Sequence, residues 1–152
     1  MSSVEWVVKE FHDLTPFDLY KILRLRSEVF VVEQNCVFQD ADNYDQGCLH
    51  LLGFHNDELI AYARLVPAGH IYQQASIGRV VTSPAHRGLG AGRKLITEAI
   101  IRINTFYGNV DIKIGAQLYL KLFYASFGFA QTGDEYDEDG IRHIHMIRSR
   151  HT

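Results

Sequence analysis

The segment HRGLGAGRKLI, residues 86–96, decides the fold. It places Gly88, Gly90 and Gly92 within five positions, directly before an apolar and basic stretch. Glycine inside a helix costs about 1 kcal/mol relative to alanine. The three glycines therefore indicate either a flexible loop ahead of a helix or a turn whose backbone must be approached closely by a ligand.

The sequence on both sides favours the second interpretation. The β-branched run at 75–82 predicts a strand that ends at Ser83-Pro84, and a helix is predicted from about Leu89 to Phe106. The first N–H groups of a helix lack partners and carry the positive end of its dipole, so they attract anions. Three basic side chains surround the same turn: Arg87, Arg93 and Lys94. The segment predicts a phosphate-binding turn.

Two common phosphate-binding motifs do not match this segment. A nucleotide-binding P-loop needs Gly-Lys followed by Ser or Thr, whereas Lys94 follows Arg93 and precedes Leu95. The dinucleotide fingerprint GxGxxG also fails, because the spacing here is GxGxG. ATP and NAD are therefore disfavoured as ligands.

Composition describes one ordinary globular domain. The chain has 152 residues, of which 47% are hydrophobic and 22% charged, and its net charge is −3. A basic field for nucleic acid or an anionic membrane is lacking. Cys36 and Cys48 form no metal-ligand pattern, so we expect no metal and reduced thiols. The first residues resemble no signal peptide and no apolar run reaches about 20 residues, so we expect a cytoplasmic protein.

The rest of the chain alternates between strand and helix patterns. A helix is predicted to begin at Thr15-Pro16, with Thr15 as its cap, and another over 118–127. Hairpin turns are predicted at Asn56-Asp57 and within 137–140. Strands are predicted at 4–11, 49–54, 59–66, 75–82, 110–116, 129–136 and 141–147. The order is that of a mixed α/β fold.

Arg87-x-x-Gly90-x-Gly92 after a strand and a Ser-Pro turn resembles the pyrophosphate motif of the GNAT acetyltransferases. QLYLKLFYASFGF, residues 117–129, resembles the family's second signature, N-x-x-A-x-x-x-Y-x-x-x-G-F, with Gln117 and Leu120 in place of its asparagine and alanine. Four further segments resemble the ElaA-like branch of this superfamily: residues 26–34, the strand of His50, residues 62–65 and residues 138–146. The resemblance implies one domain over residues 1–152 with the acyl-CoA N-acyltransferase fold, an α/β (α+β) arrangement in which helices flank a mixed, mostly antiparallel sheet.

The resemblance also implies acetyl-CoA as co-substrate. Pantetheine would pair with the backbone of a splayed strand, and the pyrophosphate would lie on the N–H groups of the glycine turn. Gln117 would offer its amide to pantetheine or to the acceptor. The implied cofactor-binding residues are Val80, Val81, Thr82, Arg87, Gly88, Leu89, Gly90, Ala91, Gly92, Gln117 and Tyr124. Arg93 and Lys94 either add charge near the 3′-phosphate or form a solvated first turn.

The implied reaction is direct attack of an amine on the thioester. Tyr124 matches the family's general acid, four residues before Gly128. A phenol, with a pKa near 10, is protonated at neutral pH and can donate to the departing thiolate; the alternative is that Tyr124 only fills helix–sheet packing. Glu33, His50 and, more weakly, His143 are candidate bases, and each histidine could instead be exposed or held by one partner.

The charged residues of the 35–47 loop leave the acceptor open. Asp40, Asp42 and Asp45 imitate a calcium loop only briefly, so we expect a solvated loop, whose charge could still attract a cationic acceptor. Three arginines could equally hold a substrate carboxylate: Arg26, Arg64 and Arg79.

Two functions from different classes therefore compete. The first is an acetyl-CoA-dependent N-acetyltransferase acting on a primary amine of a small molecule or peptide. The second is a non-catalytic acyl-CoA-binding or sensing module. Tyr124 favours the enzyme, because a mere binder has no need of a phenol beside the sulfur. A homodimer is compatible with the predicted hairpin edges.

Overall fold

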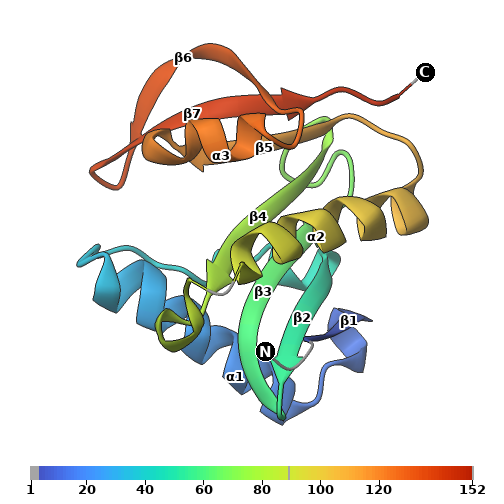
Figure 1. Cartoon of the computed structure of the whole chain (residues 1–152), viewed down its shortest axis with the longest axis vertical. Helices are drawn as coiled ribbons and strands as arrows, with labels where there is room; N and C mark the ends of the chain where they lie inside the picture. Colours follow the sequence, from blue (N-terminus) through green and yellow to red (C-terminus); the bar gives the residue numbers. More distant parts are fainter. Residues whose placement is uncertain (1–3, 89, 152) are drawn as a thin grey trace.

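Seven strands form one sheet in the order β1-β2-β3-β4-β5-β7-β6 (Figure 1). The computed structural model describes residues 4–88 and 90–151. The strands are β1 (Glu5–Glu10), β2 (Leu49–His55), β3 (Glu58–Val66), β4 (Ala75–Thr82), β5 (Ile112–Gln117), β6 (Ala130–Glu138) and β7 (Ile141–Arg148). The α-helices are α1 (Pro16–Arg26), α2 (Ala91–Tyr107) and α3 (Lys121–Ala125). A wider π-helical segment, Ser27–Glu33, extends α1.

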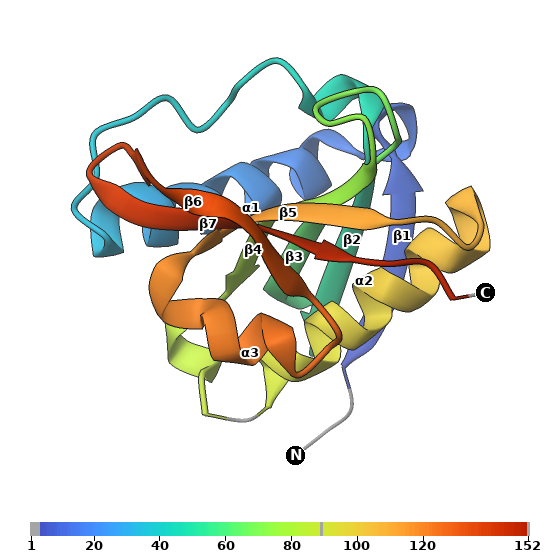
Figure 2. The ribbon, with the colours of Figure 1, turned by 90° about the horizontal axis from the view of Figure 1, so that it is seen from above.

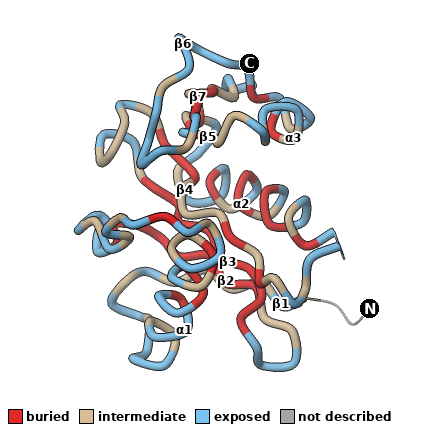
Figure 3. The backbone as a smooth tube through the Cα atoms, turned by 90° about the vertical axis from the view of Figure 1, so that its left-hand side faces the viewer, coloured by how far each residue is buried: buried red, intermediate tan, exposed pale blue. Residues whose placement is uncertain are grey.

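The sheet is mixed and mostly antiparallel, as predicted. Among the strands of the described residues, only the β4–β5 pair is parallel. Helix α1 lies against one face of the sheet, and α2 and α3 lie on the other face (Figure 2). The larger core lies between the sheet and α2, and the smaller one lies between the sheet and α1 (Figure 3). The predicted fold class is therefore confirmed.

Local sequence signals account for the element boundaries. Thr15 Oγ1 accepts a hydrogen bond from Asp18 N at 3.0 Å, and Thr15 N donates to Asp18 Oδ2 at 3.1 Å, which completes a capping box at α1. Both hairpin turns, Asn56-Asp57 and Asp139-Gly140, hold their two central residues at positive φ, as tight hairpins require. Within the described residues, no helix is long and apolar enough to cross a membrane.

Two helices differ from the predictions at their ends. Helix α2 begins at Ala91, later than predicted, because Gly90 has a φ of +76° and cannot continue a right-handed helix. The segment predicted as one helix over 118–127 contains a 3₁₀ turn at Leu118–Leu120 followed by the short α3.

Strand β4 separates from β5 soon after it begins, and this separation positions the site. The two strands pair only at Ala75–Ile112 and Ser76–Lys113. On the other side of β4, a β-bulge places two residues, Arg79 and Val80, opposite Ala63 of β3, and Arg79 adopts a φ of +49°. The bulge bends β4, so the strands diverge and leave backbone groups on their facing edges unpaired with each other.

Candidate active site

The cleft between β4 and β5 consists of two adjoining cavities. The first, here called the turn-side cavity, is lined by residues that include Glu33, Thr82, Arg87 and Gly92. The second, here called the central cavity, is lined by residues that include Arg79, Glu138 and His143. Six residues line both: Phe30, Gln34, Val80, Gln117, Leu120 and Tyr124. One continuous cleft therefore joins the glycine turn to the β6–β7 hairpin.

The glycine turn opens onto the turn-side cavity at the start of α2. Gly88 and Gly90 have φ values of +84° and +76°, and a Cβ at either would meet no atom within 4 Å among the described residues. These two glycines are therefore required by backbone conformation and not by lack of space. The first helical hydrogen bond runs from Lys94 N to Gly90 O, so the N–H groups of residues 91–93 have no partner within the helix. Leu89, the remaining predicted residue of the turn, lies outside the described residues.

An ion pair connects the turn to the opposite wall of the cleft. Arg87 donates through Nη1 and Nη2 to the two carboxylate oxygens of Glu33, at 2.6 and 2.7 Å. These hydrogen bonds hold the pKa of Glu33 below its usual value. The structure therefore pairs Glu33, a candidate base, with Arg87, a candidate pyrophosphate-binding residue.

The other two basic residues of the turn differ from each other. The Arg93 guanidinium lies 4.5 Å from the ring centroid of Phe127, and its Nη1 donates to Ser126 Oγ at 3.1 Å. Arg93 is thus held against α3, whereas Lys94 is exposed.

Tyr124 lies where the two cavities meet. It is 7% exposed, and its ring packs edge-to-face with Phe123 and Phe129 at centroid distances of 5.2 and 5.9 Å. Burial, with a smaller contribution from Tyr119, raises the pKa of Tyr124 to about 12. Within the described residues its hydroxyl forms no hydrogen bond. The phenol is therefore protonated at neutral pH and available to a ligand in the cleft.

The cleft side of β5 ends at Gln117, which lines both cavities. In the register of β5 and β7, Gln117 is directly paired with His143. His143 is buried in the wall of the central cavity, next to Glu138. The predicted residues Val80, Val81 and Thr82 lie on the opposite wall, in the part of β4 that has left β5.

His50 does not reach the cleft. It is 1% exposed, accepts a hydrogen bond at Nδ1 from the Tyr62 hydroxyl (2.7 Å) and donates from Nε2 to the Asp45 carbonyl (2.9 Å). Burial lowers its pKa. The prediction placed His50 on the acceptor side, but both ring nitrogens are engaged within the core and it lines neither cavity.

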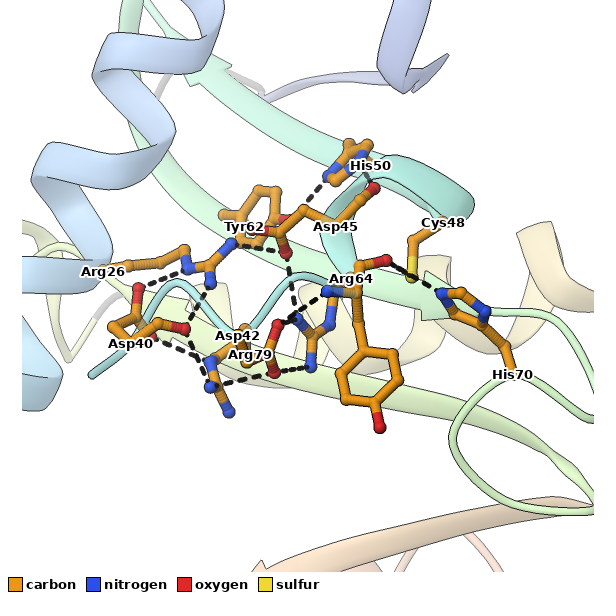
Figure 4. Close-up of polar contacts among 11 residues, drawn as sticks. Arg26, Asp40, Asp42, Asp45, Cys48, His50, Tyr62, Arg64, His70 and Arg79 are labelled. Carbon is orange, nitrogen blue, oxygen red and sulfur yellow. Dashed lines mark hydrogen bonds and ion pairs between the residues drawn. The ribbon is translucent and has the colours of Figure 1, made fainter. Parts of the chain in front are cut away.

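The acidic loop is also not the solvated loop that the sequence suggested. Its aspartates form ion pairs with three arginines of α1, β3 and β4, at N–O distances of 2.8 to 3.2 Å (Figure 4). The pairs are Arg26 with Asp40 and Asp45, Arg64 with Asp42 and Asp45, and Arg79 with Asp40 and Asp42. Arg26 and Arg64 are almost fully buried. The network compensates these charges internally and fixes the loop beside the central cavity.

The loop is fixed at its start as well. The Cys36 thiol donates to the Asp139 carbonyl at 3.3 Å, so the loop and the β6–β7 turn are joined across the central cavity. Nowhere in residues 4–88 and 90–151 do three or more His, Cys, Asp or Glu side chains gather in a way that could hold a metal ion.

Sequence reasoning missed Glu138 and the apolar lining residues Phe30 and Leu120. Glu138 had a readable signal. Once the turn is placed at Asp139-Gly140, the register of the hairpin follows, and alternation puts Glu138 and His143 on one face. Phe30 had no such signal, because its position depends on the π-helical extension of α1.

Comparison with known proteins agrees with this geometry. The family model of the acetyltransferase (GNAT) domain matches residues 29–149. The UPF0039 protein sll0451 of Synechocystis sp. is 47% identical over 146 residues, which cover 95% of each chain. Protein ElaA of Escherichia coli is 41% identical over 147 residues, or 95% of this chain and 96% of ElaA.

Solved structures give the same assignment. An acyl-CoA N-acyltransferase from Pseudomonas aeruginosa has a TM-score of 0.93 at 38% identity, with 97% of this chain and 100% of that chain covered. The crystal structure of E. coli ElaA has a TM-score of 0.90 at 40% identity, with 96% and 99% covered. The chain belongs to the GNAT acetyltransferase family and to its ElaA-like branch.

Proposed function

We propose that this protein is an acetyl-CoA-dependent N-acetyltransferase that moves an acetyl group directly to a primary amine of a small molecule or peptide. Family membership supports acyl transfer from an acyl-CoA; the acetyl group, the amine acceptor and the residue roles are the proposal. One observation carries it: a glycine turn, whose N–H groups at the start of α2 have no partner within the helix, and the phenol of Tyr124 line one continuous cleft beside the splayed strands.

The cofactor side follows from the geometry of the turn. The pyrophosphate would accept from the N–H groups at the start of α2 and would compete with Glu33 for the guanidinium of Arg87. Pantetheine would extend along Val80, Val81 and Thr82, whose backbone is unpaired on the β5 side. The thioester would then lie near Tyr124 and Gln117, the residues common to both cavities.

The chemical side needs a proton donor for the thiolate. Tyr124 supplies it in this proposal, because its phenol keeps its proton at neutral pH and faces the cleft. Attack by the amine forms the C–N bond, the C–S bond breaks, and the sulfur takes a proton from Tyr124. Solvent then reprotonates the phenol with the proton that the amide nitrogen has lost.

The first test is the melting temperature with acetyl-CoA, CoA, ATP and NAD, each in large excess. A ligand at about 100 times its dissociation constant stabilises by about 2.7 kcal/mol, or roughly 5 to 10 °C for a domain of this size. We expect a shift with both CoA species and none with NAD. Thiol release from acetyl-CoA is then screened with primary amines; no shift with either CoA species would contradict the proposal.

The homodimer remains a prediction. Strand β6 is the last strand of the sheet and is largely exposed. No strand of the described residues pairs with its outer edge, so this edge is available to a second copy of the chain. The molar mass in solution, measured by light scattering, decides between one and two copies.

A further inference from the structure

His143 is a buried polar residue in the wall of the central cavity. It is 6% exposed, lies opposite Gln117 in the sheet, and lines the same cavity as Tyr124. A buried histidine that faces a cleft needs a reason, because core positions on a strand are normally apolar.

The backbone fixes which ring nitrogen carries the proton. His143 Nδ1 lies 2.8 Å from the carbonyl oxygen of Ile141. A carbonyl oxygen can only accept, so Nδ1 must donate. In the neutral ring, Nε2 therefore has a free lone pair, and it is the nitrogen that can take a proton.

A carboxylate stands beside that nitrogen. Glu138 Oε2 lies 3.4 Å from His143 Nε2, and both residues line the central cavity. Two acceptors face each other while the ring is neutral, and an ion pair forms once Nε2 is protonated. Glu138 is therefore placed to pair with Nε2 after it has taken a proton, in the role of a positioning residue.

The other candidate bases are occupied. Both Glu33 oxygens accept from Arg87, and both His50 nitrogens are bonded within the core. Of the three candidate bases, His143 has both an available lone pair and a position in the wall of the cleft.

We propose that His143 is the general base of this enzyme and that Glu138 forms an ion pair with Nε2 once this nitrogen has taken a proton. The inference rests on the proposed acetyl transfer. An acceptor that arrives as an ammonium ion gives one proton to Nε2 of His143 and becomes the neutral amine, whose lone pair then attacks the thioester carbon. Nε2 later releases this proton to solvent, while Tyr124 protonates the departing sulfur. The two sides of the cleft thus handle separate protons.

Other titratable or charged groups face His143 and enter any pH profile. The ring stacks on Tyr136 of β6 at 5.7 Å, and His145 follows two residues later on β7. The same cavity is also lined by Arg79 of β4, Cys36 of the loop and Asp139 of the hairpin turn. Arg79 is paired with Asp40 and Asp42. Glu138 is the carboxylate nearest to Nε2.

The experiment compares two acceptors that differ in charge. One is the alkyl primary amine that the wild type acetylates fastest in the thiol-release screen; such amines have a pKa near 10 and are cationic at pH 7. The other is an arylamine of matched size, which is neutral at pH 7. We expect His143→Gln to lower kcat/KM for the alkylamine by 10²- to 10³-fold and for the arylamine by less than tenfold. The alkylamine rate of this variant should rise about tenfold per pH unit, as the free amine does.

His145→Gln is the matched control. It removes a histidine from the same face of the same strand, also stacked on Tyr136, but lines neither cavity of the cleft. Its kcat/KM should stay within threefold of the wild type for both amines. Glu138→Gln, at a more exposed site, should keep the melting temperature and lose about tenfold with the alkylamine only.

Each remaining outcome overturns a distinct statement. Equal losses with both amines, or no loss with either, would remove His143 as the base and leave the proposed function standing. A wild type that binds acetyl-CoA but releases no thiol with any amine would overturn the proposed function and the base together. If His143→Gln fails to fold, long-range ¹⁵N–¹H correlations of the wild type decide; a neutral ring protonated on Nε2 would overturn the proposal.

Discussion

Glu33 and Arg87 form a bidentate ion pair that joins the two walls of the turn-side cavity. Glu33 ends the π-helical segment that follows α1, and Arg87 precedes α2, yet their side chains meet at 2.6 and 2.7 Å. Both are about 40% exposed. The guanidinium charge at the turn is therefore compensated by a carboxylate, with which an incoming pyrophosphate competes.

Removal of that carboxylate should tighten cofactor binding. We expect Glu33→Gln to lower the Kd of CoA two- to fivefold, the size expected for an exposed charge pair, and Arg87→Gln to raise it. Isothermal titration calorimetry at two salt concentrations measures both. Glu135→Gln is the control, because Glu135 pairs with Arg142 on the β6–β7 hairpin. Weaker binding by Glu33→Gln would mean that Glu33 orients Arg87 and does not compete for it.

Two glycines of the turn are expected to have different roles: Gly90 allows a left-handed backbone conformation, and Gly92 allows a phosphate to approach the backbone closely. Gly90→Ala places a side chain at a φ of +76°, so we expect a loss of about 1 kcal/mol and a melting temperature lower by roughly 2 to 4 °C. Gly92 is helical and an added Cβ would lie 4.0 Å from Phe123. Gly92→Ala should therefore raise the melting temperature slightly, by helix propensity, yet weaken CoA binding at least tenfold. Unchanged CoA affinity in Gly92→Ala would show that no phosphate approaches this position.

The local elements were predictable because short-range chemistry determines them. The capping box at Thr15 and the two tight hairpin turns are read from a few adjacent residues, and each stands where predicted. The glycine turn was recognisable in the same way, because its spacing and its place between a strand and a helix are sequence properties.

The wall of the cleft was less predictable because it depends on pairing over long distances. His50 and His143 both alternate with apolar residues in sequence, so the pattern alone cannot distinguish them. One is enclosed by Tyr62 and the Asp45 carbonyl, and the other faces a cavity that exists only because β4 leaves β5. The ion pairs of the acidic loop depend on the same tertiary arrangement.

Tyr124 tests the donor role. Tyr124→Phe keeps the ring and its edge-to-face packing, so CoA binding should change less than twofold. Transfer to the best amine of the screen should slow by 10²- to 10⁴-fold if the phenol protonates the sulfur. Tyr20→Phe, an exposed tyrosine of α1, is the control for a lost hydroxyl. Turnover at the wild-type rate in Tyr124→Phe would assign the residue to packing and favour another proton donor.

Arg64 should be the arginine whose substitution lowers the stability of the fold most. Burial raises the pKa of Asp42 and Asp45, but their contacts with Arg64, and for Asp45 also with Arg26, outweigh it and hold both pKa values below their usual range. These carboxylates therefore contribute stability at neutral pH, which is lost as the pH falls below about 4. Arg64→Met removes one of the two arginines that pair with each carboxylate, leaving Asp42 with Arg79 and Asp45 with Arg26, and should cost about 3 kcal/mol, or roughly 10 °C. Arg142→Met removes an exposed arginine paired with Glu135 and should shift the midpoint by less than 2 °C. Thermal melts from pH 3 to pH 8 check both variants, and a midpoint of Arg64→Met equal to the wild type at pH 7 would show that the network contributes no net stability.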